Sequence, residues 1–357
     1  MNFIKGMDVS MLRELEEHGA KYYLNGEEGD LFKIMKETGV NLIRLRIWNN
    51  PYSESGEPYG GGTNDLITTL ELARRAKKQD LDIMIDFHYS DFWADPAKQF
   101  KPKAWEVLSV DELKDVVYSY TKEVLEKMRS ENIIPAIVQV GNEITNGFLW
   151  PEGKVENIAT MCELLNAGIR GVRDTMPESK VMLHLDYGTD NELYRKWFGG
   201  IEPYNLDYDI IGMSYYPFWN GSIEALVSNM NDMVDTYKKE ILITETSIGY
   251  TTDSLGCNGM VFSEELESKT VYPATQKGQE LFMKELCRAV RGVNDNKGIG
   301  VVYWEPEWLP IPECAWASRI GCDYMNDKAE LGNSWANQAL FDEKGNANRA
   351  LINLKQM

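Results

Sequence analysis

The sequence predicts a single (β/α)₈ barrel, and three observations support this prediction. Eight short runs rich in Ile, Val, Leu and Met are spread from residue 3 to residue 308. Such runs are typical of strands in a parallel sheet that is covered on both faces. Helical patterns fall between them, and no linker or internal repeat divides the 357 residues. We therefore expect one domain over residues 1–357.

The predicted strands follow one another along the whole chain. They are the runs 3–10, 42–48, 81–89, 135–143, 180–188, 208–217, 240–248 and 298–308. Helical spacing is clearest in 110–128, where apolar residues recur three and four apart and Lys and Glu fill the other face. Further helices are predicted at 30–38, 65–78, 156–175, 222–238 and 275–293. An open doubly wound sheet is the alternative, but "KGMDVSML" lacks the glycine-rich phosphate turn that would favour it.

The charge of the chain argues against two classes of partner. The formal net charge is −19, whereas nucleic acids and anionic membranes are bound by basic faces. No segment approaches the roughly 20 apolar residues of a membrane span. The N-terminal "MNFIKGMDVSML" lacks the charged start and apolar core of a signal peptide. We therefore expect no nucleic acid, no membrane span, and either an intracellular protein or a mature form.

Polar and aromatic side chains gather where the predicted strands end, while the strand starts are mostly apolar. In a (β/α)₈ barrel the active site lies at the carboxyl ends of the strands. We therefore expect a binding site there, built from Arg46, Trp48, Asn49, Asp86, His88, Tyr89, Asp91, Asn142, Glu143, His184, Asp186, Tyr215, Tyr216, Glu245, Trp304, Glu305 and Trp308.

Glu143 and Glu245 are the candidate catalytic pair. A glutamate at a strand end is usually a solvated loop residue, but each of these follows several apolar strand residues directly. They come from opposing parts of the ring, so they can face each other across a cleft. One carboxyl, with a raised pKa, can protonate the leaving oxygen of an acetal while the other attacks the anomeric carbon. A separation of about 5–5.5 Å gives retention, and about 6.5–9.5 Å gives inversion.

Tryptophans in the same loops are candidate platforms for sugar rings. A single tryptophan is more often a core residue, but several on one rim would offer flat apolar surfaces to a pyranose. These tryptophans are Trp93, Trp105, Trp219, Trp304 and Trp308.

A catalytic metal held by histidine and carboxylate side chains is the alternative to this carboxylate chemistry. His88 and His184 would be its histidine ligands, but no H-x-x-x-H or H-E-x-x-H spacing supports it. We expect no metal and no cofactor. The five cysteines leave two readings open, because Cys257, Cys314 and Cys322 can be free thiols or include one disulfide.

Longer motifs resemble one glycosidase family. "VGNEITNGFLWPEG" and "ITETS" resemble the acid/base and nucleophile strands of clan A glycosidases. "RLRIWNNPY", "DFHYSDFWADPAKQFKPKAW", "SYYPFW", "PATQKGQ", "YWEPEW" and "NSWANQALFD" resemble glycoside hydrolase family 53, the endo-β-1,4-galactanases, from Gly6 to about Asn346. The resemblance implies the barrel fold, a retaining mechanism, and cleavage of β-1,4-galactan in type I arabinogalactan and pectin side chains.

The resemblance also implies roles for single residues. Glu143 is expected to be the acid/base and Glu245 the nucleophile. Asn142 is expected to hold the 2-hydroxyl of the reacting sugar. Arg46 is expected to hydrogen-bond the nucleophile and keep it ionised, and Tyr216 to lie beside it.

Three further residues match positions of the family's sugar-binding cleft. His88 is expected to orient the site. Trp304 is expected to carry the sugar just before the cleaved bond, and Trp93 to stack on one further away.

One loop departs from the family. Bacterial members often carry a D-x-D-x-H-x-N calcium motif after the seventh strand, where this chain has "DSLGCNG", Asp253 to Gly259. Leu255 and Cys257 stand at two ligand positions, and a hard cation needs about six oxygen ligands, so we expect no calcium there. Our hypothesis is that Cys257 bonds to Cys314 or Cys322 and ties this loop to the last one.

Two other functions stay open at this point: a clan A glycosidase acting on another β-linked polysaccharide such as mannan or glucan, and a barrel that binds galactan without cleaving it. We expect a monomer. The family's habit implies a protein that is secreted or held at the cell surface, since polymeric galactan lies outside the cell. A cytoplasmic role on imported galacto-oligosaccharides is the alternative.

Overall fold

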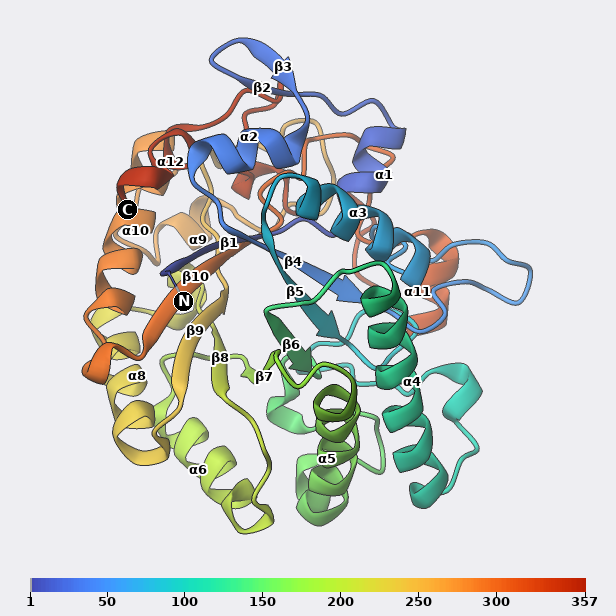
Figure 1. Ribbon diagram of the computed structural model, residues 1–357. Helices are drawn as coiled ribbons and strands as arrows, with labels where there is room; N and C mark the ends of the chain where they lie inside the picture. Colours follow the sequence, from blue (N-terminus) through green and yellow to red (C-terminus); the bar gives the residue numbers. More distant parts are fainter. Residues whose placement is uncertain (1) are drawn as a thin grey trace.

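A computed structural model of the protein describes residues 2–357 and has a closed barrel of eight parallel strands at its centre (Figure 1). The strand order is β1-β10-β9-β8-β7-β6-β5-β4, and β4 pairs with β1 to close the ring. This confirms the predicted (β/α)₈ fold and all eight predicted strands. Their bounds are β1 (Ile4–Asp8), β4 (Leu42–Ile47), β5 (Asp82–Phe87), β6 (Ile137–Val140), β7 (Lys180–Leu185), β8 (Ile210–Ser214), β9 (Glu240–Glu245) and β10 (Gly298–Trp304).

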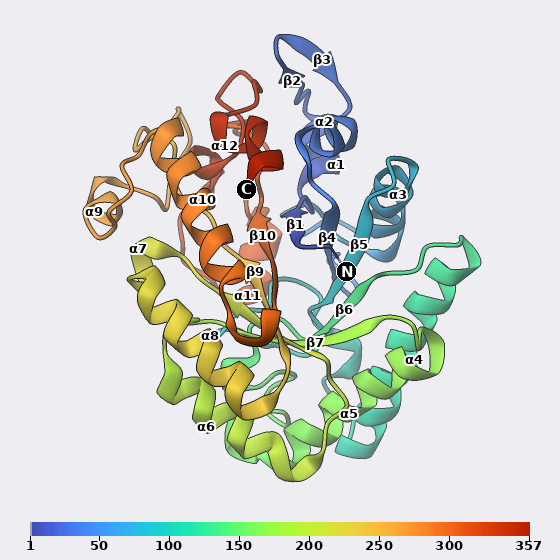
Figure 2. The same cartoon turned by 60° about the vertical axis from the view of Figure 1, so that its left-hand side comes forward.

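Helices surround the strands, as the two views of Figures 1 and 2 show. The six predicted helices are confirmed as α2 (Leu31–Thr38), α3 (Leu66–Lys78), α4 (Val110–Ser130), α5 (Ile158–Thr175), α8 (Ile223–Tyr237) and α10 (Gln276–Arg291). Their starts follow local capping rules. Ser109 and Glu112, for example, form a reciprocal capping box at the start of α4.

The sequence pattern missed the helix α6 (Asn191–Ile201). Its buried residues Tyr194, Trp197, Phe198 and Ile201 have the spacing of one helix face, which was the available signal. Shorter elements complete the chain: α1 (Leu12–Glu17), β2 (Tyr22–Leu24), β3 (Glu27–Gly29), α7 (Pro217–Asn220), α9 (Glu264–Glu267), α11 (Arg319–Met325) and α12 (Arg349–Ile352).

The inside of the barrel changes from apolar to polar along the strands. One buried apolar residue from each strand forms a cluster near the strand starts: Ile4, Leu42, Met84, Ile137, Met182, Ile210, Leu242 and Val302. Side chains two positions apart on a strand point to the same face. The next inward residues are therefore buried and polar on four neighbouring strands, namely Arg44, Asp86, Gln139 and His184. This polar layer forms the floor on which the site is built.

The disulfide hypothesis is wrong, because all five cysteines are free, buried thiols. The three candidate partners lie in separate surroundings. Cys314 is 3.6 Å from the carbonyl oxygen of Glu14, and Cys322 packs in a different apolar cluster with Trp48. Backbone hydrogen bonds join the two loops instead: Tyr250 N–H donates to Asn337, and Val261 N–H donates to Ser334.

Among residues 2–357, no helix has the length and apolar character that a membrane span requires.

Candidate active site

A cleft at the carboxyl ends of the strands brings the predicted site residues together. Its volume is about 320 Å³. The eight residues for which the resemblance implied roles all line it: Arg46, His88, Trp93, Asn142, Glu143, Tyr216, Glu245 and Trp304. They come from six strands and the loops that follow them, so only closure of the barrel places them side by side. Of the other strand-end residues that were expected to build the site, only Trp308 lines this cleft.

Glu143 stands on a turn immediately after β6, and its backbone has a positive φ of 46°. This conformation is uncommon for a residue with a side chain and is frequent at functional sites. Oγ of Ser214 lies 2.6 Å from Oε1 of Glu143. Burial raises the pKa of Glu143 well above its usual range, and the charges of Glu245 and Asp186 add to the rise. Glu143 is therefore suited to carry a proton.

Glu245 is the last residue of β9 and has different partners. Nη1 of Arg44 lies 2.8 Å from Oε1 of Glu245, and the Tyr216 hydroxyl donates to Oε2 at 3.2 Å. Burial raises the pKa of Glu245 too, but Arg44 opposes that rise. Since the arginine touches only this member of the pair, Glu245 is the carboxyl suited to remain ionised. The expected proximity of Tyr216 to Glu245 is confirmed.

The prediction that Arg46 hydrogen-bonds Glu245 is wrong, because Arg44 makes that contact. Nη2 of Arg46 instead donates to the carbonyl oxygen of Gly61 at 2.8 Å, and its Nη1 pairs with Glu305. Both arginines are inward residues of β4, two positions and roughly 7 Å apart along the strand. Arg44, the deeper of the two, is level with Glu245, and Arg46 reaches the loop that contains Gly61. Arg46 still lines the cleft.

Arg44 lies at the centre of a buried polar network. Besides Glu245, it contacts Asp8 at 2.9 Å and Asp86 at 2.8 Å. Its Nη2 donates to Oδ1 of Asn142 at 3.0 Å. The Asn142 amide nitrogen donates to the carbonyl of Ala94, which leaves one N–H for a ligand. The sequence pattern missed Arg44 as a site residue.

His184 also belongs to this network, and it is not a cation. Burial lowers its pKa well below the usual range, and Arg44 lowers it further. Nδ1 lies 3.0 Å from Oδ1 of Asn142, and Nε2 lies 2.9 Å from Oγ of Ser214. If Nδ1 carries the proton, Nε2 accepts from Ser214, and the Ser214 oxygen can accept from a protonated Glu143.

His88 is held by three contacts at 3.1 Å. Trp48 Nε1 and Ala94 N donate to its Nδ1, and its Nε2 contacts Asp86. Because Asp86 also binds Arg44, His88 connects the loop after β5 to the floor of the site.

Aromatic side chains form the walls of the cleft. The ring of Trp304 lies 4.7 Å from that of Trp335 and 6.2 Å from that of Trp93. Trp219 and Trp308 line the cleft as predicted. The platform prediction is wrong for Trp105, which is buried and packs on Tyr120. Two cleft tryptophans that were not singled out, Trp316 and Trp335, come from the long loop after β10.

The hollow continues on the other side of Glu143. A second cavity of about 490 Å³ shares Glu143, Tyr216 and Trp219 with the first, and it adds Asp186 and Tyr187. The acid/base candidate therefore lies between two adjoining cavities. Such a trough can hold a chain that extends in both directions from the reacting bond.

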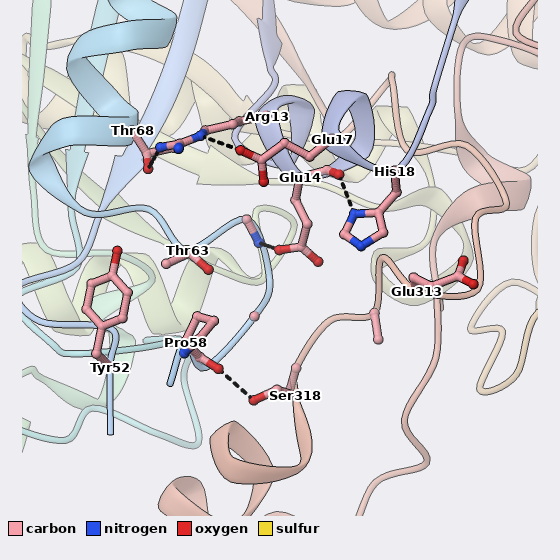
Figure 3. Close-up of a pocket in the computed structure, with 14 residues that line it drawn as sticks. Arg13, Glu14, Glu17, His18, Tyr52, Pro58, Thr63, Thr68, Glu313 and Ser318 are labelled. Carbon is pink, nitrogen blue, oxygen red and sulfur yellow. Dashed lines mark hydrogen bonds and ion pairs between the residues drawn. The ribbon is translucent and has the colours of Figure 1, made fainter. Parts of the chain in front are cut away.

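A separate cavity of about 370 Å³ lies between α1 and the loop after β4 (Figure 3). Its polar groups largely satisfy one another: Arg13 contacts Glu17 and Thr68, and Glu14 accepts from Gly62 N–H. None of the predicted site residues lines it. No group of three His, Cys, Asp or Glu side chains within residues 2–357 is arranged to hold a metal ion.

Comparisons with known proteins agree on one family. A sequence model of "Glycosyl hydrolase family 53" matches residues 4–354. The endo-beta-1,4-galactanase of Bacillus subtilis is 38% identical over 96% of this chain and 83% of that protein. The Ignisphaera aggregans GH53 catalytic domain superposes with a TM-score of 0.92 and 41% identity, covering 98% of this chain and 95% of that one. A fungal beta-1,4-galactanase structure gives a TM-score of 0.80 and 30% identity over the whole of both chains.

Proposed function

Because this chain belongs to glycosyl hydrolase family 53, we propose that it cleaves β-1,4-galactosidic bonds within galactan and type I arabinogalactan, with Glu143 as acid/base and Glu245 as nucleophile. The chain is a glycoside hydrolase, and its relatives include named endo-β-1,4-galactanases. The observation that carries the residue assignment is the asymmetry of the pair. Of the two carboxyl groups, only that of Glu245 contacts Arg44, whereas Glu143 lies beside a hydroxyl and has the more strongly raised pKa.

In the first step, a carboxylate oxygen of Glu245 attacks the anomeric carbon while Glu143 donates its proton to the leaving oxygen. The glycosidic bond breaks, the shortened chain leaves as an alcohol, and a galactosyl ester forms on Glu245. The free N–H of Asn142 would hold the 2-hydroxyl of that sugar. Tyr216 steadies the second oxygen of Glu245.

In the second step, Glu143 is ionised and acts as the general base. It takes a proton from a water molecule, whose oxygen attacks the anomeric carbon and releases Glu245. The pKa of Glu143 falls when the charge of Glu245 is consumed in the ester and rises again when that charge returns. Because of this change in pKa, Glu143 is protonated for the first step and ionised for the second.

We expect the fresh product to keep the β configuration. Two displacements at one carbon restore the original stereochemistry, whereas a single attack by water would invert it. Proton NMR during the first minutes of galactan hydrolysis reads the anomeric signal before mutarotation. An α-anomer appearing first would contradict the nucleophile role of Glu245.

We expect Trp219→Ala to raise KM for polymeric galactan about tenfold, with a smaller effect on a short galacto-oligosaccharide. Trp219 is half exposed and borders both cavities, so its removal takes away an aromatic surface that we expect a long chain to cover more fully than a short one. Tyr204→Ala removes an exposed aromatic that lines neither cavity and is the matched control. Equal losses on long and short substrates would argue against a subsite at Trp219.

Reducing-sugar release from potato galactan, β-mannan and cellulose tests the substrate class. We expect release from galactan only, with a rapid fall in viscosity because bonds are cut inside the chain. Activity on mannan or cellulose would favour a glycosidase that acts on another β-linked polysaccharide. Binding to galactan without release of sugar would favour a non-catalytic barrel.

A further inference from the structure

Two buried glutamates lie behind the cleft, in the chain between Trp304 and Trp308. Glu305 and Glu307 are both 0% exposed. Glu305 has a positive φ of 50° and donates its backbone N–H to Asp8 at 3.1 Å. This turn directs its side chain toward Arg46, with which it pairs. Because the tryptophans on either side line the cleft, the placement of this segment affects the walls of the site.

The carboxyl group of Glu307 has no hydrogen-bond donor from the described residues. Both of its oxygens lack a partner, and so does Oε2 of Glu305. The Tyr22 hydroxyl is not available to them, because it donates to the backbone oxygen of Glu307 at 2.9 Å. A buried ionised carboxylate without a donor is strongly unfavourable, so the free group must carry a proton or find one.

The neighbouring charges act in the same direction. Asp8 of β1 and Glu305 face Glu307, and the nearby cation, Arg46 of β4, is paired with Glu305. Burial raises the pKa of Glu307 well above its usual range, and the charge of Glu305 adds to the rise. Burial raises the pKa of Glu305 only to about 6, because Arg46 opposes it. We therefore expect the proton on Glu307, with Glu305 as the acceptor of its hydrogen bond.

We propose that Glu307 stays protonated and donates a hydrogen bond to Glu305, and that this acid pair is a positioning device that holds Arg46 against Trp93 in the cleft. The last part rests on the proposed function, since it assigns Trp93 to the sugar-binding wall. Glu305 and Glu307 touch no substrate themselves.

The contacts of Arg46 show how the pair would act on the cleft. The Cζ atom of Arg46 lies 4.3 Å from the ring centre of Trp93, close enough for a cation–π contact. Nη2 of Arg46 donates to the Gly61 carbonyl oxygen. The N–H of the following residue, Gly62, donates to Glu14, which lines the cavity in Figure 3. A shift of Glu305 would therefore move Arg46, this loop and the Trp93 ring together.

The protonation state can be tested without any substrate. A carboxyl with a raised pKa in the folded protein contributes stability below the ordinary pKa of Glu and loses it as pH rises toward the raised value. Glu307→Gln keeps an N–H donor for Glu305 but binds no titrating proton. Urea unfolding of both proteins is measured from about pH 5 to about pH 8. Over this range the unfolding equilibrium constant of the native protein should rise relative to that of the variant, by up to about tenfold per pH unit.

An infrared difference spectrum gives a second, independent reading. When the spectrum of Glu307→Gln is subtracted from that of the native protein at neutral pH, the difference should show the C=O stretch of a protonated carboxylic acid. The signal of Glu143 cancels because both proteins contain it. A carboxylate band in its place, together with a pH-independent stability difference, would overturn the assignment of the proton.

The positioning role is tested by the split between KM and kcat. Glu307→Met keeps the length of the side chain without a donor, and we expect it to raise KM for galactan about tenfold with kcat within about twofold. Glu307→Gln should restore KM to within about twofold of the native value. Glu313→Gln, in the same loop but outside the catalytic cleft, is the control.

Equal KM values for the Gln and Met variants would overturn the positioning role, whether both were native-like or both impaired. Failure of the proposed function gives a different pattern. In that case the native protein releases no sugar from galactan, while the infrared band and the pH-dependent stability difference persist.

Discussion

Glu245→Gln is expected to lower kcat on galactan by about four orders of magnitude or more. An amide is a poor nucleophile at the anomeric carbon, so the galactosyl ester does not form. The glutamine keeps the size of the side chain and can still meet Tyr216, so the fold should persist. Steady-state kinetics on galactan, with near-ultraviolet circular dichroism to check packing, measure both effects.

The control for this variant lies on the same strand. Glu240 is at the opposite end of β9, where it pairs with Lys180, and Glu240→Gln should leave kcat within about twofold because no reacting atom is near it. Near-native activity of Glu245→Gln would exclude Glu245 as the nucleophile.

Glu143→Gln should show a different pattern, which separates the two roles. A leaving group that needs no protonation, as in an activated aryl galactoside, should still depart in the first step. The ester then accumulates because no base activates water, and added azide should restore turnover. Glu245→Gln should show no such rescue of ester breakdown, since it forms no ester.

Arg44→Met is expected to destabilise the protein by about 3–5 kcal/mol at neutral pH. Arg44 is fully buried and contacts Asp8, Asp86 and Glu245, so its removal leaves three carboxylates without their cation in a low-dielectric interior. Urea unfolding monitored by tryptophan fluorescence measures the loss. Activity should fall as well, because the pKa of Glu245 rises once Arg44 no longer opposes the effect of burial.

The pH dependence of this loss has a definite sign. Burial raises the pKa of Glu245 and Arg44 opposes that rise, so without Arg44 the folded variant binds this proton more tightly. Its deficit should therefore shrink as pH falls and grow as pH rises. Arg74→Met, which breaks an exposed pair with Glu131, should leave the urea midpoint almost unchanged. An Arg44→Met protein as stable as the native one at neutral pH would contradict the network.

Much of the fold could be predicted because the strand signal is local. The run 240–248, for example, has three consecutive apolar residues, Ile241 to Ile243, as is typical of a strand covered on both faces. Eight such runs with helices between them predict the barrel. The two candidate carboxyl groups were selected by one geometric rule, since Glu143 closely follows a strand and Glu245 ends one. Family motifs then implied their separate roles.

What the sequence left undecided depends on distance across the barrel. Arg44 and Arg46 lie on the same face of β4 and have nearly the same neighbours in sequence. Only the position of β4 relative to β9 along the barrel axis decides which of them contacts Glu245. Likewise, nothing local shows that Trp105 packs inward on Tyr120 while Trp335, from a loop over 30 residues beyond β10, closes the cleft.

By itself the sequence predicted the barrel and the end at which the cleft lies, and it singled out two candidate carboxyl groups, because periodicity and strand termini are properties of neighbouring residues. The tertiary structure alone decided which arginine contacts Glu245, that the cysteines remain apart, and that Glu305 and Glu307 are both buried. Those outcomes depend on side-chain reach and on local exclusion of water, which arise only when distant segments pack together.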